Sequence, residues 1–207
     1  MRRRLVIFLG ALLMAFTAQE AVRAPQRVTA VRAESAPPAS QVLPRRAFAH
    51  DAEIVERYDP RTDTTTVATG PGNDDIFGRL WSPDGLLTGI DFSASFSFRD
   101  RVMQAPPAQV VLEFETFGDV QPADRPWGLE LRADGRPLPV RETPQPSAAS
   151  GGTTFLATTA TLDRAAFLDL VNASRVEGRV WGHPFVFSAQ QLELLRDLAS
   201  RLEPASR

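Results

Sequence analysis

Glu113 and Glu115 are the residues of this sequence whose spacing best matches an enzymatic mechanism. They stand two positions apart in a segment of alternating apolar residues, so an extended strand places both carboxylates on one face, about 6.8 Å apart. Glycoside hydrolases use two carboxylates separated by about 5 to 9.5 Å. Alternation alone produces such pairs on any solvated sheet face, so we expect both glutamates to be ordinary surface residues. A carboxylate-pair hydrolase of envelope polymer is therefore the alternative function.

Histidine and cysteine chemistry is sparse. The sequence has two histidines, His50 and His183, and no cysteine, which excludes disulfides, thiol catalysis and thiolate zinc sites. The acidic residues around Asp59 and Asp74 are explained by polar turns. Their spacing does not match that of a calcium-binding loop. There is also no Gly-rich phosphate loop and no Gly-x-Ser-x-Gly motif. We expect no metal site and no cofactor, and we assign no catalytic residue.

Aromatic side chains are the remaining candidates for a binding site. Trp81, Trp127, Trp181 and Tyr58 carry rings on which a sugar or peptide could stack. Trp127 lies in an apolar strip and is expected in the core. Trp181 lies beside a predicted turn that contains His183, so we expect both at the surface as the candidate binding residues.

The composition is that of one globular domain. The chain has 207 residues, of which 43% are hydrophobic and 23% charged, with 17 prolines and 13 glycines, and this excludes collagen-like, coiled-coil and wholly disordered chains. Its 23 basic residues are all arginine and are outnumbered by 25 acidic residues. Basic and acidic residues are interleaved along the chain, so a nucleic-acid partner is not expected.

The N-terminal part of the sequence predicts export. Three arginines at positions 2–4 precede an apolar run from Leu5 to Phe16, which is typical of a secretory signal peptide and too short to span a membrane. We expect a signal peptide over residues 1–24, the general secretory route, and a periplasmic or secreted protein. An uncleaved signal that holds a structural component at the envelope is the alternative. Residues 25–50, rich in Ala, Pro, Ser and Arg, are expected to form a flexible tether before a domain over 51–204.

Alternating patterns predict antiparallel strands in that domain. In residues 88–98 the apolar side chains from Ile90 to Phe98 share one face, and Asp91 shares the other face with three serines. Residues 109–117 repeat the pattern, and residues 127–131 and 153–161 give two further strands. We expect about eight strands.

Turn residues predict how some of these strands pair. Asp134-Gly135 is typical of a tight hairpin turn and places Leu131 opposite Leu138. The two prolines in 136–140 make that segment an edge strand. Gly182-His183 predicts a last hairpin in which Val180 faces Phe185. Residues 53–58 and 64–69 are expected to form an opening hairpin.

Two helices are predicted late in the chain. Asp163 is placed to cap a helix over about 163–173. Ser188 followed by Gln191 has capping-box spacing, and an apolar stripe continues to Leu202 before Pro204, which predicts a helix over 189–203. The expected fold class is α+β with β dominant: an antiparallel β-sandwich or a curved sheet with two late helices.

Three structural motifs follow one another in a fixed order: Arg57-Tyr58-Asp59 leading into Thr64-Thr65-Thr66-Val67, the hairpin Leu131–Arg136, and Val176–Val180 followed by Phe185–Leu202. In this order and spacing, residues 53 to about 203 resemble a group of exported bacterial proteins of unknown function. The resemblance implies a single exported β-rich domain. It carries no activity, cofactor or catalytic residue to positions of this chain.

The leading functional hypothesis is a non-enzymatic binding or interaction module of the cell envelope. It rests on the export signal, on the tether and on the expected edge strand at 136–140, which presents unpaired backbone groups although its prolines oppose strand addition. The expected partner is an envelope protein or polymer, with no nucleic acid and no stable membrane span.

Overall fold

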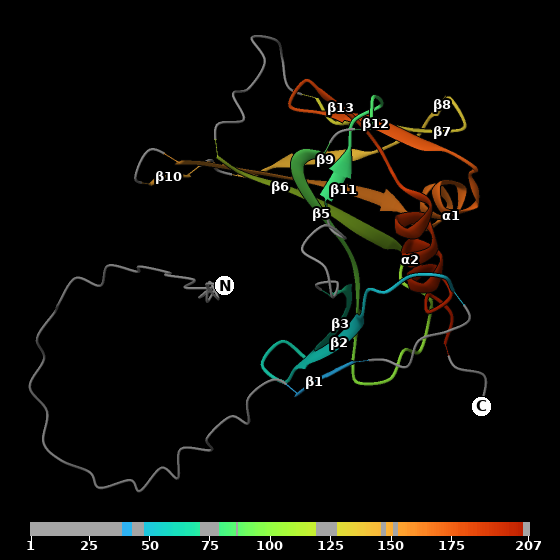
Figure 1. The fold of residues 1–207 in the computed structure, drawn as a ribbon. Coiled ribbons are helices and arrows are strands. Elements are labelled where there is room, and N and C mark those ends of the chain that lie inside the picture. The colour runs from blue at the N-terminus through green and yellow to red at the C-terminus, as the bar shows by residue number, and fades with distance from the viewer. Residues whose placement is uncertain are drawn as a thin grey trace, which may run out of the picture. The chain divides into compact units, whose positions relative to one another are not determined.

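The computed structural model describes residues 39–42, 48–70, 79–85, 87–118, 128–145, 148–150 and 153–204 (Figure 1). Contacts divide the chain into two units, Met1–Glu34 and Ser35–Arg207. All described residues belong to the second unit. The expected signal peptide at 1–24 and the tether residues 25–38 and 43–47 lie outside the described residues.

The described elements are thirteen strands and two helices. In chain order they are β1 Ala39–Val42, β2 Ile54–Asp59, β3 Thr64–Thr69, β4 Arg79–Trp81, β5 Leu87–Arg99, β6 Gln109–Gly118, β7 Glu130–Ala133, β8 Arg136–Pro137, β9 Arg141–Pro144, β10 Ala148–Ser150, β11 Thr153–Asp163, α1 Arg164–Asn172, β12 Val176–Val180, β13 His183–Val186 and α2 Ala189–Ala199. The strands that the sequence did not predict are β1, β4, β9 and β10, which have three or four residues each. Segments this short leave almost no period in the sequence.

All thirteen strands belong to one antiparallel sheet, which curls so that the fold is a curved sheet and not a sandwich of two sheets. The long strand β5 is its centre. One edge of β5 pairs with β6, while the other edge pairs with β3 near residues 95–99 and with β4 near residues 87–91. The sheet therefore branches at β5: one arm continues through β2 to β1, and the other through β13, β12 and β7 to β8.

A half-buried carboxylate joins two strands that the curl brings near each other. Glu142 on β9 accepts a hydrogen bond from the backbone nitrogen of Leu129, just before β7, at 2.9 Å. Its other carboxylate oxygen accepts one from the hydroxyl of Thr158 on β11, at 3.2 Å. Glu142 thus satisfies polar groups at a place where no backbone ladder joins β7 to β9 among the described strands.

The core lies between the curved sheet and the two helices. Alternation is confirmed on β5 and β6, where Ile90, Phe92, Val110 and Phe114 are among the buried side chains. Phenylalanine rings of β5, β6 and β13 meet there, and the ring centroids of Phe114 and Phe185 are 5.5 Å apart. Both helices pack on this side of the sheet (Figure 1), which leaves the opposite side polar.

Two of the expected hairpins form as predicted. β2 and β3 pair with Asp59 opposite Thr64. The turn at Asp134-Gly135 has positive φ at both residues, 49° and 77°, and the backbone nitrogen of Leu138 donates to the carbonyl of Leu131 at 2.9 Å. The chain leaves the sheet after Pro137, because β8 pairs only with β7 and comprises Arg136 and Pro137.

The predicted register of the last hairpin is wrong. Val180 pairs with His183, and Phe185 pairs with Gly178, so the two turn residues are Trp181 and Gly182 and not Gly182 and His183. Both have positive φ, 49° and 82°. A tryptophan at positive φ is unfavourable by itself, but the Trp181 side chain is only 4% exposed, so its burial offsets the strained turn. The prediction of an exposed Trp181 is therefore also wrong.

Both helices begin as predicted, and the second ends early. The Asp163 side chain accepts from the backbone nitrogen of Ala166 at 2.7 Å, and Ser188 and Gln191 form a complete capping box. α2 ends at Ala199, four residues before the predicted end, because the chain then tightens into bonds between residues three apart, such as Leu202 nitrogen to Ala199 carbonyl at 3.0 Å. No helix in the described part of the chain combines the length and apolarity needed to cross a membrane.

The ordered domain starts before residue 51, the start expected from the sequence. β1 lies within the expected tether and pairs with β2. The His50 side chain is fully buried, with its Nε2 atom 3.2 Å from the Oδ2 atom of Asp197 on α2. Arg201 binds the same carboxylate at 3.0 Å. These contacts pin the start of the domain to its last helix.

Candidate functional site

The side of the sheet opposite the helices carries mostly polar side chains, and we call it the polar face. It consists of the outward residues of β2, β3, β5, β6 and β11: Val55, Arg57, Thr66, Ala68, Asp91, Ser93, Ser95, Ser97, Val111, Glu113, Glu115, Ala157, Thr159 and Thr161. The pairing register places Glu113 between Ser93 of β5 and Thr159 of β11. No described helix or strand covers this face.

Three carboxylates occupy neighbouring outward positions at one end of the polar face. Asp91 on β5 pairs with Glu115 on β6, and Glu113 is the next outward residue on β6. Directly opposed side chains on neighbouring strands have Cβ atoms about 4.5 to 5.5 Å apart, so Asp91 and Glu115 are close. Burial raises the pKa of the Glu115 carboxyl above its ordinary value, and the charges of Glu113 and Asp91 raise the pKa further.

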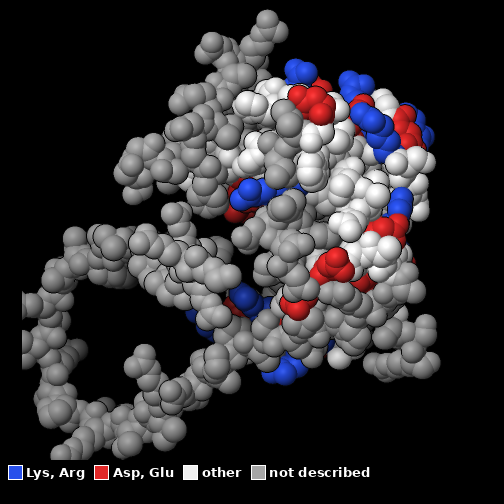
Figure 2. Space-filling view, viewed as in Figure 1, with Lys and Arg blue, Asp and Glu red and all other residues white. Residues whose placement is uncertain are grey.

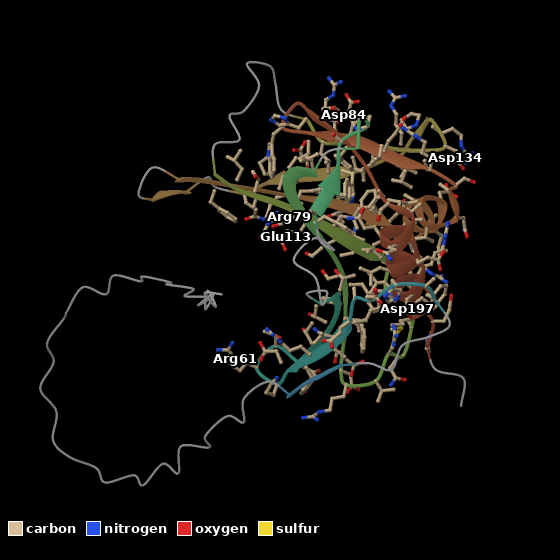
Figure 3. The ribbon with its side chains drawn as sticks, in the orientation of Figure 1. Arg61, Arg79, Asp84, Glu113, Asp134 and Asp197 are labelled. Atoms are coloured by element: carbon tan, nitrogen blue, oxygen red, sulfur yellow. The ribbon has the colours of Figure 1, made fainter. Side chains whose placement is uncertain are left out.

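One arginine partly compensates this acidic cluster. Arg79 on β4 lies opposite Asp91, and its Nε atom is 3.6 Å from the Asp91 carboxylate, with both side chains a little under half exposed. Figure 3 shows Arg79 and Glu113 in the same region of the sheet. Neither Glu113 nor Glu115 forms an ion pair with a described residue. The acidic cluster therefore retains negative charge.

An apolar hollow occupies the other end of the polar face. It has a volume of about 370 Å³ and lies over the β2–β3 hairpin, where Val55, Ala68 and Gly70 line it together with Arg57, Thr66 and Thr69. Val55 and Ala68 face each other directly across the two strands. The polar face thus has an acidic end on β5 and β6 and an apolar end with one arginine on β2 and β3.

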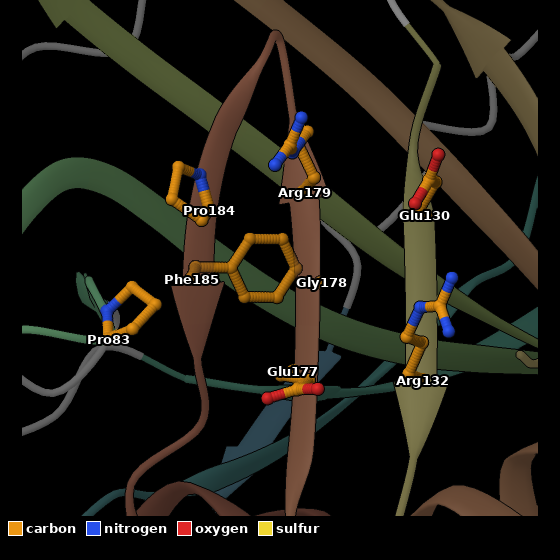
Figure 4. Close-up of a pocket in the computed structure, with 8 residues that line it drawn as sticks. All are labelled: Pro83, Glu130, Arg132, Glu177, Gly178, Arg179, Pro184 and Phe185. Carbon is orange, nitrogen blue, oxygen red and sulfur yellow. The ribbon is translucent and has the colours of Figure 1, made fainter. Parts of the chain in front are cut away.

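A second hollow lies on the outer side of β7, β12 and β13 (Figure 4). Its volume is about 180 Å³. Two acidic and two basic side chains line it, and the register sets Glu177 opposite Arg132 and Arg179 opposite Glu130. Charges of opposite sign thus face each other in both pairs, so this hollow presents no excess charge to a ligand.

The candidate binding residues Trp181 and His183 sit at the tip of the β12–β13 hairpin. Trp181 is buried in the core cluster, so its ring is not an open stacking platform. His183 is half-buried and pairs with Val180. Trp81 on β4 is half-buried and pairs with Val186 of β13 and Leu87 of β5. Tyr58 already carries the Arg101 guanidinium 4.3 Å above its ring. Trp127 lies outside the described residues.

Metal binding and charge distribution give two further observations. In the described residues, no three His, Asp or Glu side chains converge to hold a metal ion. On the side of the molecule seen in Figure 2, acidic and basic side chains are interleaved.

Some members of the site could be placed from the sequence and others could not. Alternation placed Glu113, Glu115 and Asp91 on outward strand faces, and the structure sets Glu115 opposite Asp91. Arg79 and Arg57 had no predicted role, because β4 has no detectable period and a lone arginine in a strand has no motif. The pairing of β5 with both β4 and β6 joins Arg79 to the three carboxylates.

Comparison with known proteins gave no match: no family model, no curated protein and no solved structure resembles the chain significantly.

Proposed function

We propose that the protein is an exported, non-enzymatic binding module of the cell envelope that captures its partner through the acidic end of the polar face. The observation that carries the proposal is the group of three carboxylates on a sheet face that no described element covers. Placing like charges opposite each other lowers stability, and an ionisable group with a raised pKa, such as Glu115, marks a candidate functional site. The net negative charge favours a partner with cationic groups, on an envelope protein or polymer.

Crosslinked co-purification from the native envelope tests this proposal. The substitution Glu113→Arg reverses one charge in the acidic cluster. Asp169→Arg makes the same reversal at an exposed position of α1 and serves as the control. We expect a partner at near-stoichiometric yield with the wild type and the control, and its loss with Glu113→Arg, while circular dichroism shows equal folding. Equal capture by both variants would exclude the acidic end as the binding surface.

Export is tested separately by the intact mass of the protein recovered from the envelope. Cleavage at the expected site removes about 24 residues. A full-length mass would show that the signal is not cleaved. It would favour a structural component that the signal holds at the envelope.

A hydrolase that uses a carboxylate pair is the second candidate, and the raised pKa of Glu115 favours it. General acids in hydrolases are carboxyl groups whose pKa is raised so that they hold a proton near the working pH. Glu115→Gln and Glu113→Gln keep the side-chain size and remove the titrating group. An envelope-polymer hydrolysis lost in both variants would support this candidate, and identical turnover in wild type and variants would reject it.

A further inference from the structure

We infer that the hollow over the β2–β3 hairpin is a second binding site, for a carboxylate that carries an unbranched apolar tail. This goes beyond the proposed partner capture, which uses the opposite, acidic end of the polar face. The hollow holds about 370 Å³, within the range of small-molecule sites, about 300 to 1,000 Å³.

The walls of the hollow suit an apolar tail. Val55 and Ala68 form a cross-strand apolar pair that remains half-buried, although they point to the side of the sheet away from the core. Gly70 keeps the end of the hollow open, since a Cβ atom there would stand 3.0 Å from the Val55 Cγ2 atom. A ligand that covers these groups removes apolar surface from water.

The polar groups of the hollow leave one position for a charged head group. The Thr66 hydroxyl is bonded to the Ser97 hydroxyl at 2.9 Å, and the Thr69 hydroxyl accepts from the Ala94 backbone nitrogen at 3.0 Å. Arg57 is exposed and forms no ion pair or side-chain hydrogen bond with any described residue. Its guanidinium is the charged group in the hollow with unused donors.

The chemistry of that guanidinium selects the head group. Arginine binds a carboxylate through two parallel N–H···O bonds. Among the described residues that line the hollow, Arg57 is the single charged one, which matches a monoanion, whereas a cationic head group would be repelled. A neutral alcohol with the same tail would lose the charge-assisted bonds.

Calorimetric titration of the purified protein with decanoate tests the inference, with decanol and acetate as matched probes. We expect saturable decanoate binding, at least about tenfold weaker binding of decanol because a hydrogen bond to a charged group is lost, and none of acetate at the same concentrations. From hexanoate to decanoate, affinity should rise by about fourfold for each methylene that is buried.

Two variants separate the head-group contact from the apolar contact. Arg57→Gln should lower decanoate affinity to that of decanol. Ala68→Phe fills the hollow with a residue that strands accept well and should abolish the binding of both decanoate and decanol. Arg179→Gln, which removes an exposed arginine of β12 outside the polar face, is the control and should bind decanoate like the wild type.

The outcomes also separate this inference from the proposed function. Decanoate binding that is equal in wild type and Glu113→Arg, without any partner captured, supports the hollow and rejects partner capture. No saturable decanoate binding by the folded wild type, or unchanged binding by Arg57→Gln and Ala68→Phe, overturns the inference and leaves partner capture unaffected.

Discussion

The Asp197 carboxylate is the charged group whose replacement should most affect stability, and Asp197→Asn tests this with little change of shape. The substitution keeps the size of the side chain and one acceptor oxygen, and it removes the negative charge. That charge stands 3.2 Å from His50 Nε2 and 3.0 Å from Arg201.

Burial sets the magnitude of the effect. The side chains of Asp197, His50 and Arg201 are 1%, 0% and 9% exposed, so water cannot replace the lost interaction. Removing one partner of a buried ion pair costs about 3 to 5 kcal/mol, out of a total stability of about 5 to 15 kcal/mol for a domain. We expect Asp197→Asn to lower the free energy of unfolding by about that amount.

Urea unfolding followed by tryptophan fluorescence measures this change, and an exposed pair supplies the control. Asp59 is 3.5 Å from Arg61, with side chains 30% and 79% exposed, and Asp59→Asn should cost about 1 kcal/mol or less. Arg201→Gln and the double variant complete a cycle, in which the two losses should add to more than the loss in the double variant. A loss below about 1 kcal/mol for Asp197→Asn, equal to the control, would refute the view that this pair pins the start of the domain.

Three further predictions concern single positions. Gly178→Ala should destabilise the domain by at least about 1 to 3 kcal/mol in thermal unfolding, because the added Cβ would stand 2.3 Å from the Glu130 carbonyl oxygen; a change below 0.5 kcal/mol would show that β12 moves freely. Ser188→Ala should cost about 1 kcal/mol, because the backbone nitrogen of Gln191 loses its cap at 3.2 Å, and an unchanged urea midpoint would contradict a role for the cap. The raised pKa of Glu115 makes its charged form less favourable in the folded state. Stability should therefore fall as the pH rises from 4.5, the ordinary pKa of a glutamate, through the higher pKa of Glu115 in the folded protein. Glu115→Gln should flatten this part of the pH profile, and an identical profile in both proteins would contradict the assigned cause.

Local patterns were sufficient for much of the fold. The inward face of residues 88–98, the turn at Asp134-Gly135 and both helix caps follow from chemistry within a few residues, and each is confirmed. Alternation places Ile90 and Phe92 on one side of the backbone whatever their partners are. A turn that needs positive φ at two positions selects residues such as Asp and Gly locally.

The candidate site depended on pairing between distant segments. Sequence alternation placed Asp91 and Glu115 outward, but they stand 24 positions apart in the chain, and only the β5–β6 register sets them opposite each other. The hollow over the β2–β3 hairpin likewise exists because Val55 and Ala68 face each other across the two strands and Gly70 has no side chain. Neither arrangement has a signal within one segment.

The sequence by itself determined the strand faces, the caps and the β-dominant class, because backbone geometry and turn chemistry act over a few residues. Tertiary structure alone decided that Trp181 is buried at positive φ, that His50 binds Asp197 across 147 positions, and that three carboxylates share one face. These outcomes depend on which surfaces meet when the sheet curls. The free energy of burial can then exceed a local preference such as that against tryptophan in a left-handed turn.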